Sequence, residues 1–293
     1  MPVVSIILPT CDRPDLWPRA LRSVLRQTWQ DWEVVLVDSN RRTMRLRDSV
    51  AWIEFAAEPR VRLVDTPHTP SAAAARNVGL AVARAEWVTY LDDDDVYLPD
   101  KVEAQLALAR ATGAPLVLCG YTVVLPKRRR TRQVEAAAFC DDERLTDANW
   151  GTPMLFHRLE PRVCFDETLR AGEDEVFAHT LIALHRVARV PNCARSLVEV
   201  FPQLGADRVH RGEAVWHAYR ATWRITHRLY SRRARRAYLA MGRLVRAQNQ
   251  HGGVMHFLRC VRAVLATRGP GAWRLVVNAT AHRFGLFSNW MVS

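Results

Sequence analysis

Residues 86–95 read EWVTYLDDDD, an apolar run that passes directly into four consecutive aspartates. The aromatic and β-branched residues predict a buried strand at 86–91. Adjacent ionised carboxylates raise one another's pKa unless a counter-charge is present. Mg²⁺ or Mn²⁺ supplies such a charge and commonly bridges one or two carboxylates to a diphosphate. We therefore expect a metal–diphosphate site at Asp92–Asp95. The alternative is that Asp94 or Asp95 caps a helix beginning near Pro99.

Strands and helices alternate on both sides of this run. Strands are predicted at 3–8, 33–38, 61–64 and 115–124, and helices at 15–29, 45–57, 71–84 and 99–112. This order predicts an α/β fold with a mostly parallel sheet and helices on both faces. Ligands of such sheets bind beyond the carboxyl ends of the strands. We therefore expect Pro9–Asp12, Asp38 and Asp92–Asp95 to lie along one edge.

The pattern changes after residue 124. The basic run KRRR at 127–130 predicts an exposed hairpin or loop, and 131–152 is expected to be irregular. Short strands are expected at 152–157 and 189–191, with a polar loop at 165–175 and a helix at 176–187. The polar loop carries Glu173 and Asp174.

The charge of the 293-residue chain is unevenly distributed. The formal net charge is +12, with 49% hydrophobic and 25% charged residues, which excludes a disordered chain or a fibre. Residues 206–293 contain 16 Arg, no Lys and 2 acidic residues, a charge of +14, whereas residues 1–205 carry −2. We therefore predict two parts, a domain at 1–212 and a basic helical region at 213–293.

The cysteines and the N-terminus indicate a cytoplasmic setting. No two of the 6 cysteines have CxxC spacing, so we expect reduced thiols and neither a zinc knuckle nor a redox pair. The N-terminus MPVVSII has no basic region or cleavage site of a signal peptide. No run of about 18 uncharged apolar residues predicts a membrane span.

Two segments resemble the start of family 2 glycosyltransferases with the GT-A fold. They are VVSIILPTCDRPDLWPRALRSVLRQTWQDWEVVLVDS at 3–39 and AAARNVGLAVARAEWVTYLDDDDVYLPDKVE at 73–103. The resemblance extends over about residues 3–205. It implies an inverting, metal-dependent enzyme that moves a sugar from a nucleotide-diphosphate donor, first of all a UDP-sugar. The acceptor would be a saccharide or a lipid-linked saccharide in bacterial envelope polysaccharide or lipopolysaccharide assembly.

The same resemblance implies roles for individual residues. Asp95 and Asp94 would bind the metal, Mn²⁺ or Mg²⁺, with His210 near the metal or diphosphate. The nucleotide-sugar site would be formed by Pro9, Thr10, Asp12, Arg13, Asp38, Arg76, Asn77, Asp92, Asp93 and Asp94. The pair Glu173 and Asp174 would be catalytic, with Asp174 as general base. A base is also what the chemistry needs, because the acceptor hydroxyl must lose a proton. From spacing alone, Asp174 serves equally well as a helix cap.

The second strand departs from the family pattern. Many relatives continue it with Asp-Asp-Gly-Ser, whereas this chain has Asp38-Ser39-Asn40-Arg41. One carboxylate and the flexible Gly are missing, which puts the base and sugar preference in doubt. Arg41 and Arg42 add positive charge near the expected nucleotide, where they would hold a diphosphate or simply be exposed.

The basic region is expected to form amphipathic helices at 214–230, 232–249, 254–267 and 272–287. Arg on one side and aromatic and aliphatic residues on the other suit an anionic membrane surface. The alternative is that the helices pack on the body with their Arg solvated. Nucleic acid is not expected as a partner, because there is no recognisable motif and no extended basic groove. The rival functions are a nucleotidyltransferase, disfavoured because 9–14 lacks Gly, and a non-catalytic membrane- or nucleic-acid-binding protein on the same body.

Overall fold

The computed structural model describes residues 1–41, 45–68, 71–125, 128–132, 151–187, 189–202 and 213–227, with isolated positions between 235 and 264. The chain divides into two compact units. The first comprises Met1–Ala137, Trp150–Glu167 and Val190–Gln203, and the second comprises Ala138–Asn149, Thr168–Arg189 and Leu204–Ser293. Each unit is described by itself. The predicted boundary between residues 212 and 213 stays a prediction.

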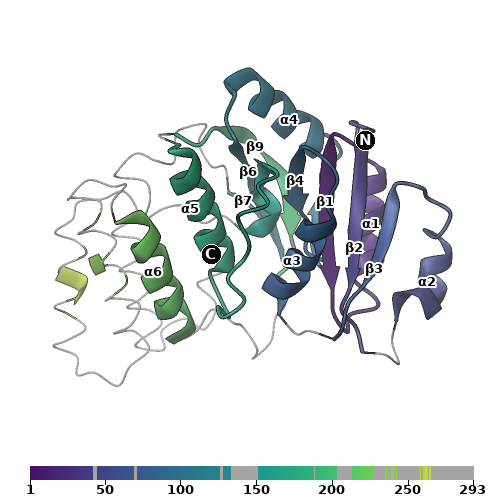
Figure 1. Cartoon of the computed structure of the whole chain (residues 1–293), viewed down its shortest axis with the longest axis horizontal. Coiled ribbons are helices and arrows are strands. Elements are labelled where there is room, and N and C mark those ends of the chain that lie inside the picture. Colours follow the sequence, from purple (N-terminus) through teal and green to yellow (C-terminus); the bar gives the residue numbers. More distant parts are fainter. Residues whose placement is uncertain are drawn as a thin grey trace. The chain divides into compact units, whose positions relative to one another are not determined.

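The first unit contains a nine-stranded mixed sheet in the order β3-β2-β1-β4-β8-β6-β9-β5, with β7 paired to β6 (Figure 1). The strands are β1 (Val4–Thr10), β2 (Trp32–Asp38), β3 (Val61–Asp65), β4 (Trp87–Tyr90), β5 (Val96–Tyr97), β6 (Leu116–Leu125), β7 (Arg128–Arg132), β8 (Phe156–Arg158) and β9 (Asn192–Val200). The four strands β3, β2, β1 and β4 are parallel. The predicted α/β fold is confirmed.

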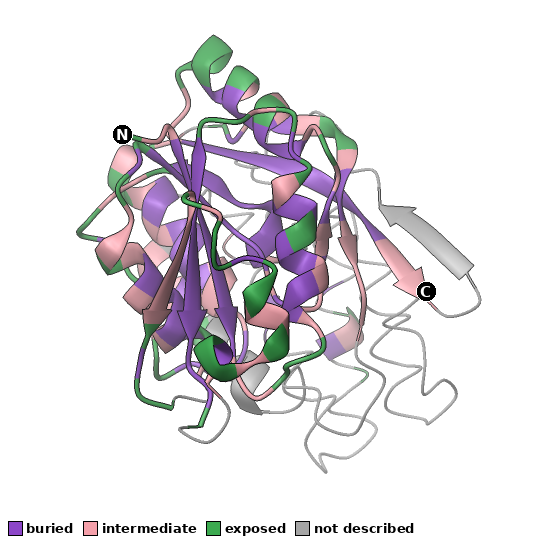
Figure 2. Ribbon diagram, turned by 90° about the vertical axis from the view of Figure 1, so that its right-hand side faces the viewer, coloured by how far each residue is buried: buried purple, intermediate pink, exposed green. Residues whose placement is uncertain are grey.

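Helices cover both faces of the parallel strands. The helices of this unit are α1 (Trp17–Leu25), α2 (Val50–Ile53), α3 (Ala72–Val82) and α4 (Lys101–Thr112), with 3-10 turns η2 (Leu46–Asp48) and η3 (Thr152–Met154). Strands β1 and β2 are buried along their whole length (Figure 2). Their even-numbered side chains, such as Ile6, pack in one cluster with Trp17 and Leu21 of α1. Because successive side chains point to opposite faces, the odd-numbered set meets α3 instead.

Gly79 lets α3 approach that second face closely. A Cβ at this position would lie 2.5 Å from Ile7 Cγ2 and 3.3 Å from Val37 Cγ2. Both distances are shorter than ordinary van der Waals contact, so the helix and the two strands fit together because residue 79 has no side chain. The Ala-Arg-Asn-x-Gly motif thus has a packing role at its last position.

Four expectations are corrected by the structure. The helix expected at 45–57 is interrupted, because Ser49 is extended at φ −87° and ψ 144° and its hydroxyl caps a new helix by accepting the Trp52 N–H. The aspartates precede the short strand β5, and α4 begins only at Lys101 after Asp100, so they cap no helix. The strand expected at 152–157 begins with η3 and reaches β8 only at Phe156. The short strand expected at 189–191 is instead the nine-residue β9.

The hairpin expectation at 127–130 is confirmed at backbone level for the described residues, because β7 pairs antiparallel with β6. Cys11, Cys119, Cys164 and Cys193 form no disulfide, as expected, whereas Cys140 lies outside the described residues.

The second unit contains α5 (Glu173–His185) and α6 (Glu213–Thr226), which pack against each other. The helix expected at 176–187 is α5, which begins one turn earlier because Gly172 adopts φ 72° before it. The first of the four C-terminal helices expected from the sequence is confirmed as α6. The other three, at 232–249, 254–267 and 272–287, lie largely outside the described residues, as does most of 131–150. Within the described residues, no helix is long and apolar enough to cross a membrane.

Candidate active site at the carboxyl ends of the parallel strands

The ends of β1, β2 and β3 lie side by side. Thr10 is in register with Asp38, and Asp38 is in register with Asp65. Strand β4 is in register with β1 up to Tyr90, so the aspartates that follow it emerge at the same edge. This edge is where a parallel sheet places ligands. The expected convergence of these strand ends is confirmed.

The loop after β1 contacts the aspartate run directly. The Thr10 hydroxyl donates to Asp93 Oδ2 at 2.7 Å. Arg13 forms ion pairs with Asp93 at 2.7 Å and with Asp94 at 3.0 Å. The two segments are far apart in sequence, so these contacts fix the conformation of an acidic turn that would otherwise repel itself.

Two further arginines approach the aspartates from helices. Arg76 of α3 is 4% exposed and pairs with Asp92 at 2.6 Å. Arg19 of α1 donates to the backbone carbonyl of Asp94 and stacks 3.9 Å from the centre of the Phe201 ring. The positive ends of these side chains lie against the acidic turn, so the site combines carboxylates with fixed guanidinium groups.

The four carboxylates differ in exposure. The side chains of Asp92 and Asp94 are 27% and 17% exposed, whereas Asp93 and Asp95 are buried. Burial raises the pKa of Asp93 to about 7, opposed by the nearby charge of Arg13 and the Thr10 hydrogen bond. Burial raises the pKa of Asp95 well above its ordinary value, and the charges of Asp92 and Asp94 raise it further. Removing water and adding like charge both disfavour the ionised form.

Asp95 is the carboxylate that best fits a metal ion. It accepts the Phe201 N–H at 3.1 Å, and no Lys or Arg of the described residues forms an ion pair with it. Asp93 is already engaged by Thr10 and Arg13. The aspartates do not bring three carboxylates together within one coordination sphere. A Mg²⁺ or Mn²⁺ ion held by one or two carboxylates together with a diphosphate needs no such triad. The residues therefore fit the expected ion.

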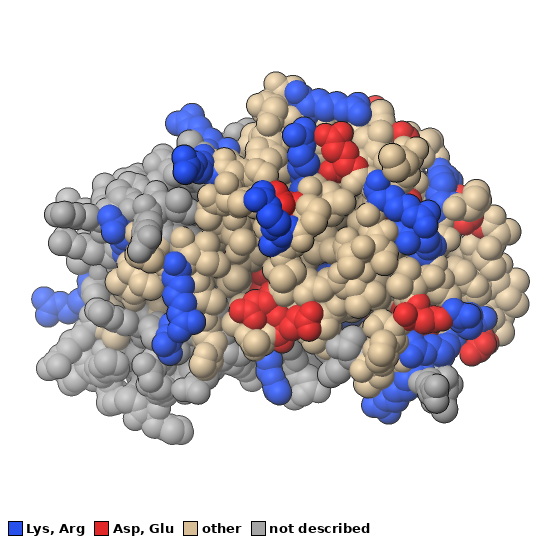
Figure 3. Space-filling view, in the orientation of Figure 1, with Lys and Arg blue, Asp and Glu red and all other residues tan. Residues whose placement is uncertain are grey.

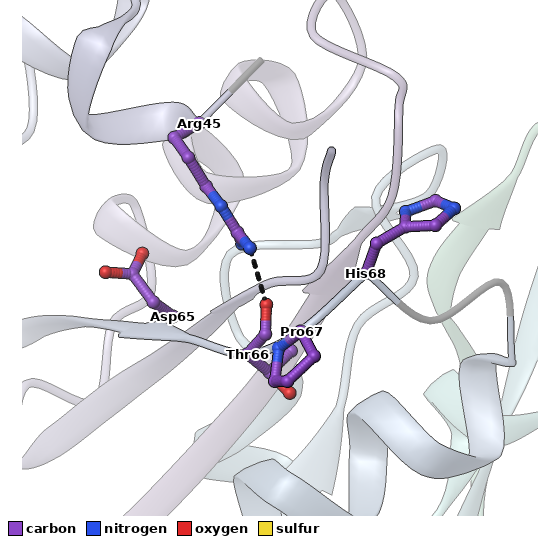
Figure 4. A pocket seen from close by; sticks show the side chains of 5 residues that line it. All are labelled: Arg45, Asp65, Thr66, Pro67 and His68. Carbon is purple, nitrogen blue, oxygen red and sulfur yellow. Dashed lines mark hydrogen bonds between the residues drawn. The ribbon is translucent and has the colours of Figure 1, made fainter. Parts of the chain in front are cut away.

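A pocket of about 780 Å³ lies beyond the ends of β2 and β3. Figure 4 shows its lining residues Arg45, Asp65, Thr66, Pro67 and His68. Arg45 donates to the carbonyl oxygens of Asp38 and Thr66, each at 2.8 Å, and so joins the two strand ends. One wall of the pocket is thus a guanidinium that is fixed to backbone oxygens.

The Asp38 carboxylate, at the end of β2, is buried. Its oxygens accept the N–H groups of Asn40 at 3.0 Å and Leu46 at 2.8 Å, and Arg45 lies 3.5 Å away. These bonds shape the chain after β2. The family resemblance assigns Asp38 to the nucleotide-sugar site. To contact a ligand there, the carboxylate would have to use oxygens that already accept hydrogen bonds from the backbone.

Three other predicted residues also have defined surroundings. Asp12 has a positive φ of 54° and pairs with Arg41 at 3.0 Å. Asn77 donates to the Phe165 carbonyl at 3.0 Å and accepts the Phe165 N–H at 2.8 Å, so it holds the loop after β8. Pro9 is in register with Val37 inside the sheet.

Glu173 and Asp174 belong to the second unit, in the first turn of α5. The Asp174 carboxylate accepts the N–H of Glu175 at 2.8 Å. Gly172 occupies the cap position, so Asp174 is not the N-cap residue of this helix. His210 and Arg42 lie outside the described residues.

Sequence reasoning missed Arg19, Arg45 and His68. His68 follows the end of β3, so the rule that ligands bind beyond strand ends would have identified it. Arg19 lies inside α1 and Arg45 directly precedes η2, and no local pattern marks either of them.

Comparison with known proteins agrees with this arrangement. Residues 5–171 match the family described as Glycosyl transferase family 2, which is more than half of the chain. The chain belongs to glycosyl transferase family 2. The family segment contains the four parallel strands and the aspartate run.

Curated family 2 relatives come from bacteria. The succinoglycan biosynthesis protein ExoO of Rhizobium meliloti is 28% identical over 200 residues, 62% of this chain and 56% of that protein. The putative colanic acid biosynthesis glycosyl transferase WcaA of Escherichia coli is 32% identical over 36% of this chain and 37% of that protein. The chain thus spans about half or less of the length of these relatives. The names of both relatives refer to the biosynthesis of bacterial polysaccharides, succinoglycan and colanic acid.

Solved structures show the same fold. Staphylococcus aureus TarS 1-349, crystallised in complex with UDP-GlcNAc, superposes with a TM-score of 0.69 and 14% identity. The match covers 96% of this chain and 88% of that one. The GT-A fold expected from the sequence is thereby confirmed.

Proposed function

We propose that this family 2 enzyme is an inverting, metal-dependent transferase that moves a sugar from a UDP-sugar to a saccharide or lipid-linked saccharide. The observation that carries the proposal is the Asp92–Asp95 turn at the end of β4. It is fixed by Thr10 and Arg13, and its buried Asp95 forms no ion pair within the described part of the chain. An acidic turn beside fixed arginines suits a metal-bound diphosphate.

The donor assignment is supported by the surroundings of the turn and by relatives. TarS was crystallised with UDP-GlcNAc, and the relative WfgD of Escherichia coli is named a UDP-Glc:alpha-D-GlcNAc-diphosphoundecaprenol beta-1,3-glucosyltransferase. We assign the pocket beside Arg45 to the nucleoside, because it lies along the same sheet edge as the aspartates. The proposed donor-binding residues are Pro9, Thr10, Asp12, Arg13, Asp38, Arg76, Asn77, Asp92, Asp93 and Asp94.

Asp95 and Asp94 would hold the divalent cation, with His210 as a further contact to the metal or diphosphate. When bound, the cation supplies charge that stabilises the leaving diphosphate. Arg13 already neutralises Asp93 and Asp94 in part and has an exposed face, its side chain being 44% exposed. Arg13 is therefore placed to meet a phosphate as well as a carboxylate.

Asp174, with Glu173 beside it, would act on the acceptor. The acceptor oxygen forms a bond to the anomeric carbon while the bond from that carbon to the diphosphate oxygen breaks. The proton of the acceptor hydroxyl passes to the Asp174 carboxylate, and attack on the opposite face inverts the configuration. Asp174 lies in the first turn of α5, where the helix dipole stabilises negative charge.

For the acceptor side, we propose a cytoplasmic enzyme that associates with the inner face of the membrane through residues 213–293. WfgD's printed name includes a diphosphoundecaprenol acceptor, which is a lipid-linked saccharide. In α6, Arg220 and Arg224 are exposed while Thr222 is buried, so the helix is two-sided. Contact between α6 and α5 also supports the alternative in which these helices serve only to pack within their own unit.

Nucleic acid is not proposed as a partner. On the face drawn in Figure 3, Asp and Glu side chains are interspersed with Lys and Arg among the described residues. A groove that follows a phosphate backbone needs a continuous basic lining instead.

The test is a screen of nucleotide sugars for slow donor hydrolysis and for transfer, with Mn²⁺ or Mg²⁺ and with EDTA. The proposal expects turnover of one UDP-sugar that depends on the cation. Turnover of a nucleoside triphosphate would favour the nucleotidyltransferase alternative. No turnover and no binding of any donor would favour the non-catalytic protein.

A further inference from the structure

A second group of metal-ligating side chains lies at the same sheet edge as the aspartate turn and shares no side chain with it. Cys11 and Asp12 directly follow β1, and His68 lies three residues beyond the end of β3. Their Sγ, carboxylate oxygen and ring nitrogen all lie within 4.8 Å of one another. In the described part of the chain, this is the one such triad of His, Cys, Asp or Glu.

The distances within the group suit a tetrahedral ion. Zinc binds Cys sulfur at about 2.3 Å and His nitrogen at about 2.0–2.1 Å, which for a tetrahedral angle separates the two ligand atoms by roughly 3.6 Å. Cys11 Sγ lies 3.7 Å from His68 Nδ1. The Ser39 carbonyl oxygen is a third neighbour, 3.5 Å from Cys11 Sγ and 3.0 Å from His68 Nδ1.

The ligand atoms of Cys11 and His68 favour a different kind of ion than the carboxylates of the aspartate turn do. Thiolate and imidazole favour Zn²⁺ and similar soft or borderline ions, whereas carboxylates alone suit Mg²⁺ and Mn²⁺. We propose that Cys11, Asp12 and His68 form a binding site for a thiophilic divalent cation of the Zn²⁺ type. Binding releases the Cys11 thiol proton to solvent and uses the Nδ1 lone pair of neutral His68, whose proton moves to Nε2.

Hydrogen bonds and an ion pair with neighbouring residues fix the position of Asp12. Its backbone N–H donates to Asn40 Oδ1, and its positive φ of 54° turns the chain after Cys11. Arg41 competes for the same carboxylate, with its Nε 3.0 Å from Oδ2 and its backbone N–H 3.1 Å from Oδ1. An ion at Asp12 would have to share the carboxylate with this guanidinium, so removing the Arg41 side chain should strengthen binding.

Occupation of the site would change the wall of the nucleoside pocket. His68 lines that pocket and also a second one of about 500 Å³ beside α3. An ion would fix the imidazole and place positive charge there. The binding site itself does not depend on the proposed transferase activity, so its test requires no substrate.

The experiment titrates the full-length protein with Zn²⁺ in excess Mg²⁺, and with Co²⁺ as a spectroscopic probe of thiolate ligation. We expect one Zn²⁺ per chain and a thiolate-to-cobalt charge-transfer band. Cys11→Ser should abolish the band, and Cys11→Ser and His68→Gln should each weaken Zn²⁺ binding by about tenfold or more, the scale that even outer-shell changes reach. Arg41→Ala should strengthen it.

Cys164→Ser is the matched control, because Cys164 is an exposed thiol outside this group. Thermal melting of each variant without metal shows whether it folds. The proposal is overturned if folded Cys11→Ser keeps the charge-transfer band and the Zn²⁺ affinity, or if Cys164→Ser loses them instead.

Discussion

The hydroxyl of Thr10 donates to Asp93 Oδ2 at 2.7 Å, joining the end of β1 to an acidic turn 83 residues later in the chain. Both side chains are buried, so the carboxylate has no water to replace this donor. Thr10→Val removes the donor at nearly constant shape. We expect the free energy of unfolding to fall by about 1–3 kcal/mol, the usual effect of leaving a buried acceptor unsatisfied.

Thr10→Ser is the control, since it keeps the hydroxyl and loses one methyl group. Urea unfolding of both variants in EDTA measures the difference. Equal stability of Thr10→Val and Thr10→Ser would show that the bond contributes nothing.

A second prediction concerns Lys101, which is fully buried at the start of α4. Its ammonium donates to Thr89 Oγ1 and lies 4.0 Å from the centre of the Tyr97 ring. Burial lowers the pKa of Lys101 to about 7, opposed by the nearby thiols of Cys119 and Cys193. The unfolded chain therefore binds more protons than the native state between about pH 7 and about pH 10.

It follows that the contribution of Lys101 to stability rises with pH across this window. The slope is at most about 1.4 kcal/mol per pH unit. Burial raises the pKa of Cys119 to about 12, so that group titrates above the tested range.

We expect Lys101→Met to have a larger free energy of unfolding than wild type below about pH 7. We expect this difference in stability to shrink by about pH 8.5. Urea unfolding at three pH values measures it, with Arg110→Met as control. Parallel pH curves for wild type and Lys101→Met would contradict the assignment.

A third prediction addresses the metal. Asp95→Asn removes the carboxylate of a buried side chain that forms no ion pair with Lys or Arg in the described part of the chain. We expect the Mn²⁺-dependent part of UDP-sugar binding, measured by calorimetry, to be lost, while any binding in EDTA is kept. Asp31→Asn, on the exposed surface, should behave as wild type. Unchanged Mn²⁺-dependent affinity in Asp95→Asn would exclude Asp95 as a ligand.

These residues also show what could be predicted from the sequence. The aspartates were recognisable because four like charges directly follow a buried strand, a purely local pattern. Strands β1 to β4 were predictable for the same reason, since each is a short apolar run between helices. The alternation of strands and helices predicted a parallel sheet, and the carboxyl ends of parallel strands lie at one edge of the sheet.

Contacts between distant segments could not be read in this way. Strand β8 inserts antiparallel between β4 and β6, and β9 runs parallel to β6, although neither shows a clear apolar alternation. The ion pairs of Arg13, and the hydrogen bonds from Arg45 to the carbonyl oxygens of Asp38 and Thr66, depend on which strand ends are neighbours. Tertiary pairing decides such features, and one sequence contains no signal of it.

A fourth prediction concerns Asp174 in the first turn of α5. Asp174→Asn preserves the shape and the acceptor oxygen for the Glu175 N–H, but it cannot take a proton from an acceptor hydroxyl. We expect donor binding to stay at the wild-type value and transfer to fall by about 100-fold or more, as for loss of a general base. Transfer is measured with saturating donor.

Glu175→Gln is the matched control, because it lies in the same turn and changes the same charge. It should retain transfer. Wild-type turnover by Asp174→Asn would refute the base assignment, whereas equal loss in both variants would indicate an effect of charge on the helix end.

The last prediction separates a membrane role from mere packing for the basic region. Arg220 and Arg224 are exposed on α6, and each basic residue near an anionic surface contributes about 1 kcal/mol to binding. Arg220→Glu together with Arg224→Glu should therefore reduce cosedimentation with anionic liposomes at low salt by more than tenfold. Arg84→Glu together with Arg110→Glu, at two exposed positions of the first unit, makes a matched charge change and should have little effect. If both proteins bind liposomes equally, the attraction comes from net charge, and α6 then serves only to pack against α5.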